Sequence, residues 1–312
     1  MNTVISIVSP LLLVAVIGFA AVRTAVMSVE QLHGLAKFLV LIAIPALLLL
    51  SLASMDIRAV LDPTLMLAYV GIGAPLAILA WLVVRFGLGK QRVCATTVAL
   101  GVAIPNNIIL GYPLSAQVFG DAVLPVFAGV LLIENVIYLP LAYLVYEWIE
   151  HNGSLSFRNL ATIGRRVVAN PITLSVSLGL ACAYWSIALA SSLEHAMDML
   201  GAGVTGVALF VIGGMLASAS KLTPEAEVWV GVVMRLVLAP VLAVVMCSTI
   251  VDLGAVDSGL LLLLSAAPCF SILPAIATPY GAGLLGARIQ ITGTVVSLIT
   301  LPIILYYVST TI

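Results

Sequence analysis

Long apolar stretches separated by short polar segments run through the whole sequence. Several of them contain uninterrupted runs of leucine, such as residues 47–50 and 260–264, and do not alternate between apolar and polar positions. Membrane-spanning β-strands would show segments of about 10 alternating residues, whereas a helix needs about 20 apolar residues to cross a hydrocarbon core of roughly 30 Å. The pattern therefore predicts an all-α protein of membrane-spanning helices.

Charged and turn residues divide the apolar pattern into ten predicted spans. These are residues 4–22, 36–54, 64–86, 93–119, 122–146, 168–189, 200–219, 228–250, 259–280 and 284–308. The longest polar stretch follows the fifth span. We therefore expect two five-helix halves, residues 1–150 and 167–312, joined by a polar connection at residues 151–166.

The distribution of Lys and Arg predicts how the spans are oriented. In the even-numbered connections the only basic residue is Arg58, whereas the odd-numbered ones carry Arg23, Lys37, Arg85, Lys90, Arg92, Arg158, Arg165, Arg166, Lys221 and Arg288. Because short cytoplasmic loops retain Lys and Arg, the odd connections are predicted to be cytoplasmic and both termini non-cytoplasmic. An odd number of spans in each half makes the halves inverted repeats, a common architecture of transporters.

Composition excludes several other classes of protein. With 63% hydrophobic and 8% charged residues, the sequence has too little polar surface to cover a water-soluble globule, and we expect it to be solvated by lipid. A net charge of -1 provides no basic face for nucleic acid. The four cysteines stand singly, and no metal-ligand spacing, phosphate-binding loop or nucleophile–base pair is present. We predict no enzyme activity, no metal site and no cofactor.

The predicted fourth span is interrupted at its middle by Pro105, Asn106, Asn107, Gly111 and Pro113. Proline removes a backbone donor and clashes with the preceding turn, and amides in hydrocarbon are unfavourable unless they meet partners or a cavity. This helix should be broken, with free backbone groups around Pro105.

The ninth span repeats this arrangement with Pro268, Ser271 and Pro274. Each broken span is the fourth of its half, so an inverted repeat would bring the two breaks together. Inward-pointing helix N-termini there would favour an anion. The alternative is that the prolines only kink packed helices; the matched breaks favour a binding site.

These motifs resemble those of the auxin efflux carrier family, which includes plant auxin exporters and bacterial carriers, within the superfamily of bile-acid sodium symporters. The resemblance covers essentially the whole sequence. It is carried by Ile104 through Leu114, which resembles the family's crossover motif, and by Ile44-Pro45, Asn170-Pro171, the segment 208–214, Arg235 before Pro240, and Tyr280-Gly281. One departure is that the interval from Pro268 to Pro274 is a residue longer than in the plant proteins.

The resemblance implies a ten-helix fold with a scaffold domain and a crossover domain that moves as an elevator and carries small carboxylates. It places Asn106 on the family's substrate-contacting asparagine. It also implies a multi-pass protein of the bacterial inner membrane that forms a homodimer. Since the connection after the fifth span is short, regulation through a long cytoplasmic loop is not expected.

Two of the charged residues inside predicted spans bear on the site. Glu134, beside Asn135, costs at least about 2.5 kcal/mol on insertion scales, so it is either a coupling site for H⁺ or Na⁺ or a protonated carboxyl that makes one interhelical hydrogen bond. Arg235 could be a countercharge in the binding site, but near a helix end it is more often a side chain that extends to the lipid headgroups.

We therefore predict a secondary or facilitative transporter of small organic anions, favouring efflux. The predicted substrate-binding residues are Pro105, Asn106, Asn107, Asn135, Pro268, Ser271 and Ser51, with Glu134 for ion coupling and Gly111, Pro113 and Pro274 shaping the crossover. Two alternatives stay open: a Na⁺- or H⁺-coupled importer of a dicarboxylate such as malonate, and a membrane receptor or channel.

Overall fold

The fold is a helical assembly, given by a computed structural model that describes residues 2–53, 55, 60, 62–151, 153–154, 157–217 and 225–311. Side chains are described from residue 13 onward and at residue 10. Arg58, Lys221 and the predicted ends of the second and seventh spans lie outside the described residues.

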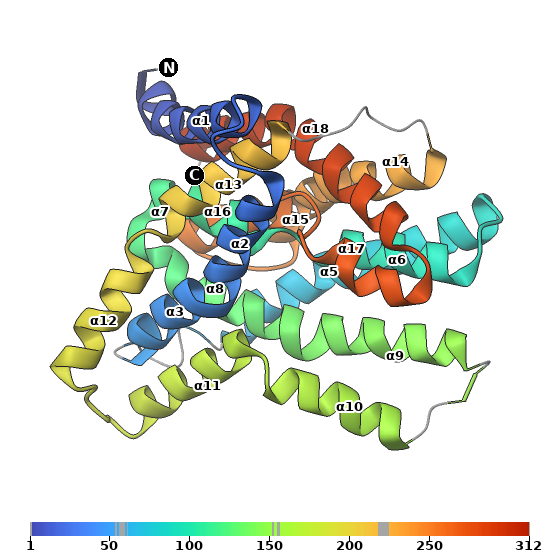
Figure 1. The fold of residues 1–312 in the computed structure, drawn as a ribbon, viewed down its shortest axis with the longest axis horizontal. Coiled ribbons are helices and arrows are strands. Elements are labelled where there is room, and N and C mark those ends of the chain that lie inside the picture. The colour runs from blue at the N-terminus through green and yellow to red at the C-terminus, as the bar shows by residue number, and fades with distance from the viewer. Residues whose placement is uncertain are drawn as a thin grey trace.

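Every regular element of the described ranges is helical (Figure 1). The elements before residue 151 are α1 (Asn2–Arg23), α2 (Val29–Phe38), η1 (Leu39–Ala43), α3 (Ile44–Ala53), α5 (Pro63–Leu82), η2 (Val83–Gly87), α6 (Arg92–Ala103), η3 (Asn107–Gly111), α7 (Tyr112–Phe119), η4 (Gly120–Ala122), α8 (Val123–Leu132), η5 (Ile133–Tyr138) and α9 (Leu139–Glu150). The later elements are α10 (Phe157–Val168), α11 (Pro171–Tyr184), α12 (Ser191–Gly201), α13 (Val204–Ala217), α14 (Ala226–Val233), η6 (Met234–Leu238), α15 (Ala239–Thr249), α16 (Ala255–Ala266), α17 (Leu273–Ala277), η7 (Thr278–Tyr280) and α18 (Gly283–Thr311).

Six continuous helical segments of the described ranges are long and apolar enough to cross a membrane. They are Val29–Ala53, Pro63–Gly87, Asn107–Glu150, Ser191–Ala217, Ala226–Thr249 and Gly283–Thr311. A seventh is added if α10 and α11, which meet at a bend of 59°, form one span. The predicted class of a multi-helix membrane protein is therefore confirmed, while the count of ten spans stays a prediction.

The predicted polar connection at residues 151–166 contains most of a helix, α10. Helix α10 combines the exposed apolar side chains of Phe157 and Leu160 with Arg158, Arg165 and Arg166, and it runs beside α9 (Figure 1). Apolar and basic side chains on one short helix are typical of helices that lie in the membrane interface. A search for long apolar runs misses such a helix because its apolar residues are spaced around the turns.

Helices α1 and α13 approach each other closely at two glycines. A Cβ atom at Gly213 would lie 1.7 Å from the carbonyl oxygen of Ala15, and one at Gly18 would lie 2.0 Å from the carbonyl oxygen of Phe210. Each glycine thus receives the backbone of the opposite helix. Small residues at such contacts let membrane helices approach closely without an apolar driving force.

We expect Gly213→Ala to push α1 and α13 apart and to destabilise the protein by about 2 kcal/mol or more, because the obstructing atom is backbone and cannot rotate away. The measurement is thermal unfolding of the purified protein in detergent. Gly206→Ala is the matched control in the same helix, since nothing lies within 4 Å of its added Cβ. Equal melting temperatures for the two variants would contradict this reading of the pairing.

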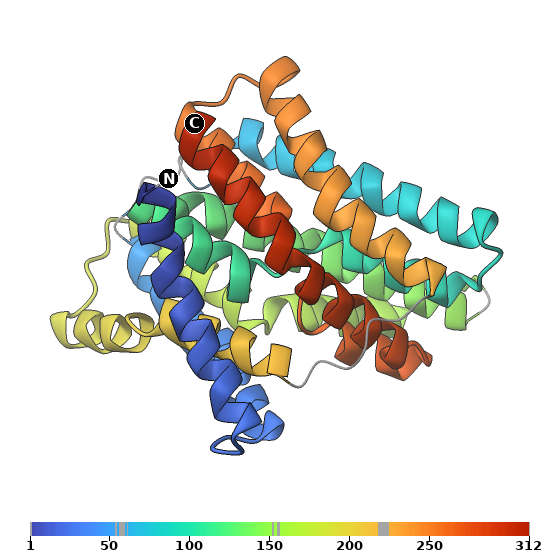
Figure 2. The same cartoon turned by 90° about the horizontal axis from the view of Figure 1, so that it is seen from above.

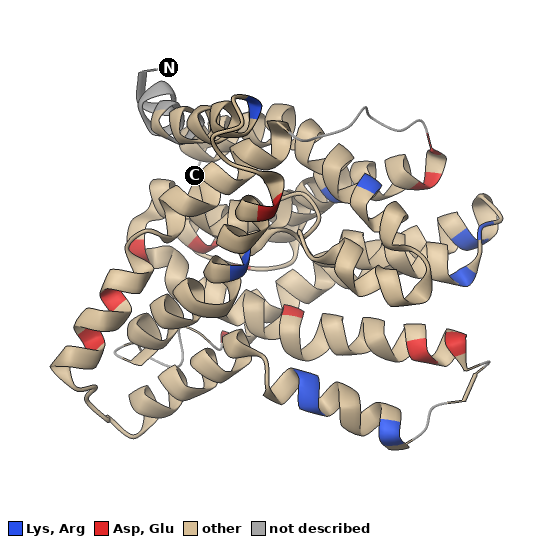
Figure 3. Ribbon diagram, in the orientation of Figure 1, with Lys and Arg blue, Asp and Glu red and all other residues tan. Residues whose placement is uncertain are grey.

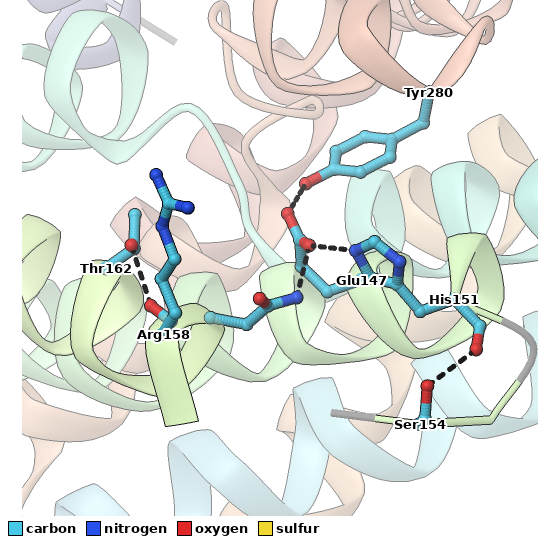
Figure 4. A network of polar contacts seen from close by, with 7 residues as sticks. Glu147, His151, Ser154, Arg158, Thr162 and Tyr280 are labelled. Atoms are coloured by element: carbon cyan, nitrogen blue, oxygen red, sulfur yellow. Dashed lines mark hydrogen bonds and ion pairs between the residues drawn. The ribbon is translucent and has the colours of Figure 1, made fainter. Parts of the chain in front are cut away.

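Charged residues lie chiefly near helix ends and connections (Figure 3). At the end of α9, the Glu147 carboxylate accepts hydrogen bonds from the Tyr280 hydroxyl at 3.0 Å and from the Asn159 amide of α10 at 2.8 Å, with His151 at 3.4 Å (Figure 4). Tyr280 also stacks on Tyr146, with ring centroids 4.4 Å apart. Parts of both sequence halves are therefore tied together at this end of α9. Elsewhere in the second half, α14 and α18 lie side by side (Figure 2).

Candidate functional site

The two broken helices meet through their backbones. Helix α6 ends at Ala103 and α16 at Ala266, and Pro105 and Cys269 form an antiparallel β-bridge between the segments that follow. The N–H of Asn106 donates to the carbonyl of Pro268 at 2.6 Å. The N–H of Phe270 donates to the carbonyl of Ile104 at 3.2 Å. The prediction that the breaks come together is confirmed.

Asn106 stabilises the break that it follows. Its side-chain oxygen accepts from the N–H of Ile109 at 3.4 Å, which caps the start of η3, and its amide nitrogen donates to the hydroxyl of Ser271 at 2.8 Å. Capping side chains of this kind satisfy N–H groups that the first helical turn leaves without partners. Asn106 thus connects the two breaks through its side chain as well as its backbone.

Asn107 faces a buried carboxyl group. Its amide nitrogen donates to Glu134 Oε1 at 2.8 Å and to the Tyr69 hydroxyl at 3.2 Å, and that hydroxyl donates to the same Glu134 oxygen at 2.6 Å. Glu134 is 4% exposed. Glu134 therefore accepts two hydrogen bonds, not the single interhelical one that the alternative hypothesis assumed. One of the two comes from Asn107, in the first break.

Gly111 makes room for this arrangement. A Cβ at residue 111 would lie 2.4 Å from the side-chain oxygen of Asn107, an oxygen that is buried and has no hydrogen-bond partner in the structure. Pro274 lies in the first turn of α17, where a missing N–H removes no helical hydrogen bond. Pro113 lies at the junction of η3 and α7, inside a continuous helix, so its missing N–H removes one helical donor there. The role of these three residues in shaping the crossover stays a prediction.

Arg235 corrects the expectation that it extends to the lipid headgroups. It lies in η6, is 3% exposed, and donates to the carbonyls of Val102 at 2.9 Å and Ala267 at 3.0 Å, and also to the carbonyl of Ser265. Val102 lies in the last turn of α6, and the other two lie at the end of α16. One guanidinium therefore satisfies carbonyls at the C-terminal ends of both half-helices, where cations are favoured.

Asn135 forms a second polar connection at the site. Its amide nitrogen donates to the carbonyl of Leu131 at 2.8 Å, and its oxygen accepts from Asn170 at 2.9 Å. Asn170 caps α11, accepting from the N–H of Ile172 at 2.9 Å. The start of α11 is thereby held beside the Glu134 segment.

A cavity of about 80 Å³ lies against the first break, large enough for a small polar group with a few waters. It is lined by Val40, Ile104, Pro105, Asn106, Asn107, Ile108, Ile109, Glu134, Asn135, Leu139, Asn170, Ile172, Phe270, Ser271 and Ile272. Six of the predicted site residues are among them. Two predicted substrate-binding residues do not line the cavity. Pro268 contacts Asn106 through its carbonyl group, and Ser51 lies on α3.

Tyr112 and Tyr280, two tyrosines close to the breaks in the sequence, lie outside the cavity lining. Tyr112 packs on Phe127 with ring centroids 4.8 Å apart, and Tyr280 stacks on Tyr146, so neither lines the cavity. Tyr69 and Asn170 were not predicted. A tyrosine within an apolar span and an Asn-Pro pair at a helix start were the only signals, and neither indicates a partner.

Comparison with known proteins decides the class. A family model described as "Membrane transport protein" matches residues 3–305. The chain belongs to this family of membrane transport proteins. The resemblance to auxin efflux carriers is thereby confirmed. A curated relative, "Auxin efflux carrier component 8" of Arabidopsis thaliana, is 23% identical over 270 residues, which cover 70% of this chain and 73% of the relative.

As a membrane transport protein, the chain is a transporter and not an enzyme. It is an integral, multi-pass membrane protein, which agrees with its apolar helices, and it handles a small-molecule substrate within a lipid bilayer. Transporters of several folds place their sites where broken helices meet. The cavity at the paired breaks is therefore the candidate binding site of this membrane transport protein.

Proposed function

We propose that the protein carries small organic anions, with carboxylates as the substrate class, through a site at the paired breaks. The observation that carries the proposal is the antiparallel contact of Pro105 with Cys269 at the edge of a cavity whose apolar wall also carries amide and hydroxyl groups. Unwound segments at such a contact offer backbone groups that regular helices do not. Alternating exposure of this site to the two sides of the membrane would move the substrate.

Apart from the carboxyl group of Glu134, the polar groups of the lining can donate to an anion. Asn106, Asn135 and Asn170 contribute amide groups, Ser271 a hydroxyl, and the cavity adjoins the N-terminal turn of the continuous η3–α7 helix. Amide and hydroxyl donors with a helix N-terminus favour a carboxylate without requiring a buried cation. The relative named for auxin efflux supports the same substrate class and efflux as the direction.

The wider architecture is part of the proposal. The chain would have ten membrane helices in two inverted halves, residues 1–150 and 167–312, with the residues between them on the cytoplasmic side. Both termini would then be non-cytoplasmic, in a bacterial inner membrane. The crossover helices would move as an elevator against a scaffold, within a homodimer.

A coupled importer of a dicarboxylate such as malonate is the second candidate. The hydrogen bond from Asn107 to Glu134 favours it, because binding or release of H⁺ or Na⁺ at this carboxyl group would change the contacts of the first break. A gradient requirement separates coupled import from facilitated efflux. A receptor would bind without translocation, and a channel would conduct far faster than a carrier.

We expect Asn106→Ala to slow flux about tenfold or more at subsaturating substrate, since a hydrogen bond to a charged group contributes about 1.5–3 kcal/mol. Liposomes containing the protein would be assayed with labelled indole-3-acetate and malonate, with and without H⁺ and Na⁺ gradients. Ser51→Ala is the control, because Ser51 lies outside the cavity lining. Unchanged flux in correctly folded Asn106→Ala protein would remove this asparagine from the binding site.

A further inference from the structure

A second hollow lies on the outer side of the helices that carry the site. It is formed between α5, α6 and the η5–α9 helix and encloses about 390 Å³, within the size range of small-molecule pockets. Alanines from all three helices make it concave, among them Ala77, Ala99 and Ala142. Ile78 and Leu141, at its rim, are 61% and 55% exposed, so the hollow opens toward the lipid.

The wall of this hollow, called the groove from here on, is almost entirely hydrocarbon. The indole N–H of Trp81 donates to the Thr96 hydroxyl at 3.2 Å, so these two polar groups satisfy each other. The Tyr138 hydroxyl points to the carbonyl of Val70 at 3.5 Å. A polar ligand would find few partners along the groove, whereas an alkyl chain would lose nothing by entering it.

The length of the groove matches one leaflet of a bilayer. On the η5–α9 helix it extends from Tyr138 to Trp148, which corresponds to about 15 Å at 1.5 Å per residue, half of a hydrocarbon core of roughly 30 Å. Its inner end is at Tyr138 and Ala103, next to the first break. Its outer end is at Trp81 and Trp148, the residue type that favours the interface with the headgroups.

Positive charge gathers at the outer end. The Arg92 guanidinium lies 5.5 Å from the centroid of the Trp148 ring. Arg85 lies 5.7 Å from the Phe86 ring, which packs against Trp81 at 5.8 Å. In the parts of the chain that the structure describes, neither arginine is in a salt bridge, whereas Lys90 between them pairs with Glu227 at 2.9 Å. Figure 3 shows these basic residues gathered at the α5–α6 connection.

We propose that this groove binds an anionic phospholipid, with one acyl chain between α5, α6 and α9 and the phosphate at Arg85 and Arg92. The apolar wall and its single-leaflet length select an acyl chain, and the two arginines at the outer end select a negative headgroup. This inference is independent of the proposed substrate site. It adds a lipid ligand whose chain end lies against the last residue of α6.

The test uses the purified full-length protein, delipidated in detergent and then offered phosphatidylglycerol or phosphatidylcholine with identical acyl chains. Native mass spectrometry would count the lipids retained. We expect the wild type to retain phosphatidylglycerol preferentially. Each arginine near an anionic headgroup contributes a factor of about five in affinity, so the double variant Arg85→Gln/Arg92→Gln should lose roughly 25-fold in preference. The matched control, Arg23→Gln/Lys37→Gln on α1 and α2, away from the groove, should keep it.

A second variant tests the groove itself. Ala77→Phe fills the hollow from α5 and should reduce retention of both lipids while leaving the melting temperature of the protein near that of the wild type. Equal retention of the two lipids by the wild type would overturn the proposal, as would full preference in the Arg85/Arg92 variant. A dimer whose partner subunit seals this groove, detected as a cross-link between copies from an Ala77→Cys variant, would overturn it too.

Discussion

Replacing Arg235 by methionine is expected to cause the largest loss of stability among single substitutions at the site. The change leaves the carbonyls of Val102, Ser265 and Ala267 without their guanidinium partner in a buried environment. Each unsatisfied buried group costs about 1–3 kcal/mol, so we expect a loss of at least about 3 kcal/mol, or roughly 5 °C in melting temperature. Transport should be lost together with stability.

The control for this prediction is Arg288→Met, which removes an arginine paired with Glu225 where both side chains are about one-third exposed. Exposed pairs contribute between about 0 and 1 kcal/mol, so its melting temperature should stay close to that of the wild type. Arg235→Lys keeps the charge but not the planar fork of donors, and we expect an intermediate result. If Arg235→Met melted like Arg288→Met, the guanidinium would not hold the two half-helices.

Glu134→Gln is expected to abolish accumulation driven by an ion gradient while leaving the fold intact. Glutamine retains an oxygen that can accept from Tyr69 and Asn107, so the hydrogen bonds at Oε1 survive. It can neither release a proton nor balance Na⁺ with a negative charge. In liposomes, uptake against a substrate gradient should fall to background, whereas exchange of labelled for unlabelled substrate should continue.

Two comparisons complete that experiment. Tyr69→Phe removes one donor to Glu134 but keeps its carboxyl group, so coupling should weaken without being lost. Asp121→Asn, a carboxyl group in the short turn η4, should leave coupling unchanged. Gradient-driven uptake at the wild-type level in Glu134→Gln would refute the coupling role and favour facilitated efflux.

The sequence was sufficient to predict the features that depend on local chemistry. Pro105 and Pro268 cannot donate a backbone hydrogen bond, so the breaks could be placed to within a residue or two. Their meeting followed from equivalent positions in the two halves, and the structure shows it as the Pro105–Cys269 bridge. Six of the predicted site residues line the cavity, because they belong to the two breaks or to the segment that contains Glu134.

What the sequence did not predict depends on which neighbour a side chain faces. Arg235 near a helix end has the same sequence pattern whether it extends to headgroups or turns inward to two helix ends. Tyr69 appears only as an aromatic residue in an apolar span, although its hydroxyl contacts Glu134. For Asn106 and Asn107 the sequence indicates polar groups at the break but not their contacts with Ser271 and Glu134. Tertiary contacts, which a single sequence does not encode visibly, decide these roles.

The contact between the two breaks also determines when, during synthesis and folding, the site can be completed. Asn106 and Ser271, which it binds, are 165 residues apart. During synthesis the first break enters the membrane long before its backbone partners at Pro268 and Phe270 exist. Until then its unpaired N–H and C=O groups must be satisfied by water or by the translocation machinery, because lipid cannot do so. Completion of the site is therefore one of the last steps of folding, and truncation before residue 268 should leave the earlier helices inserted with an open, hydrated break.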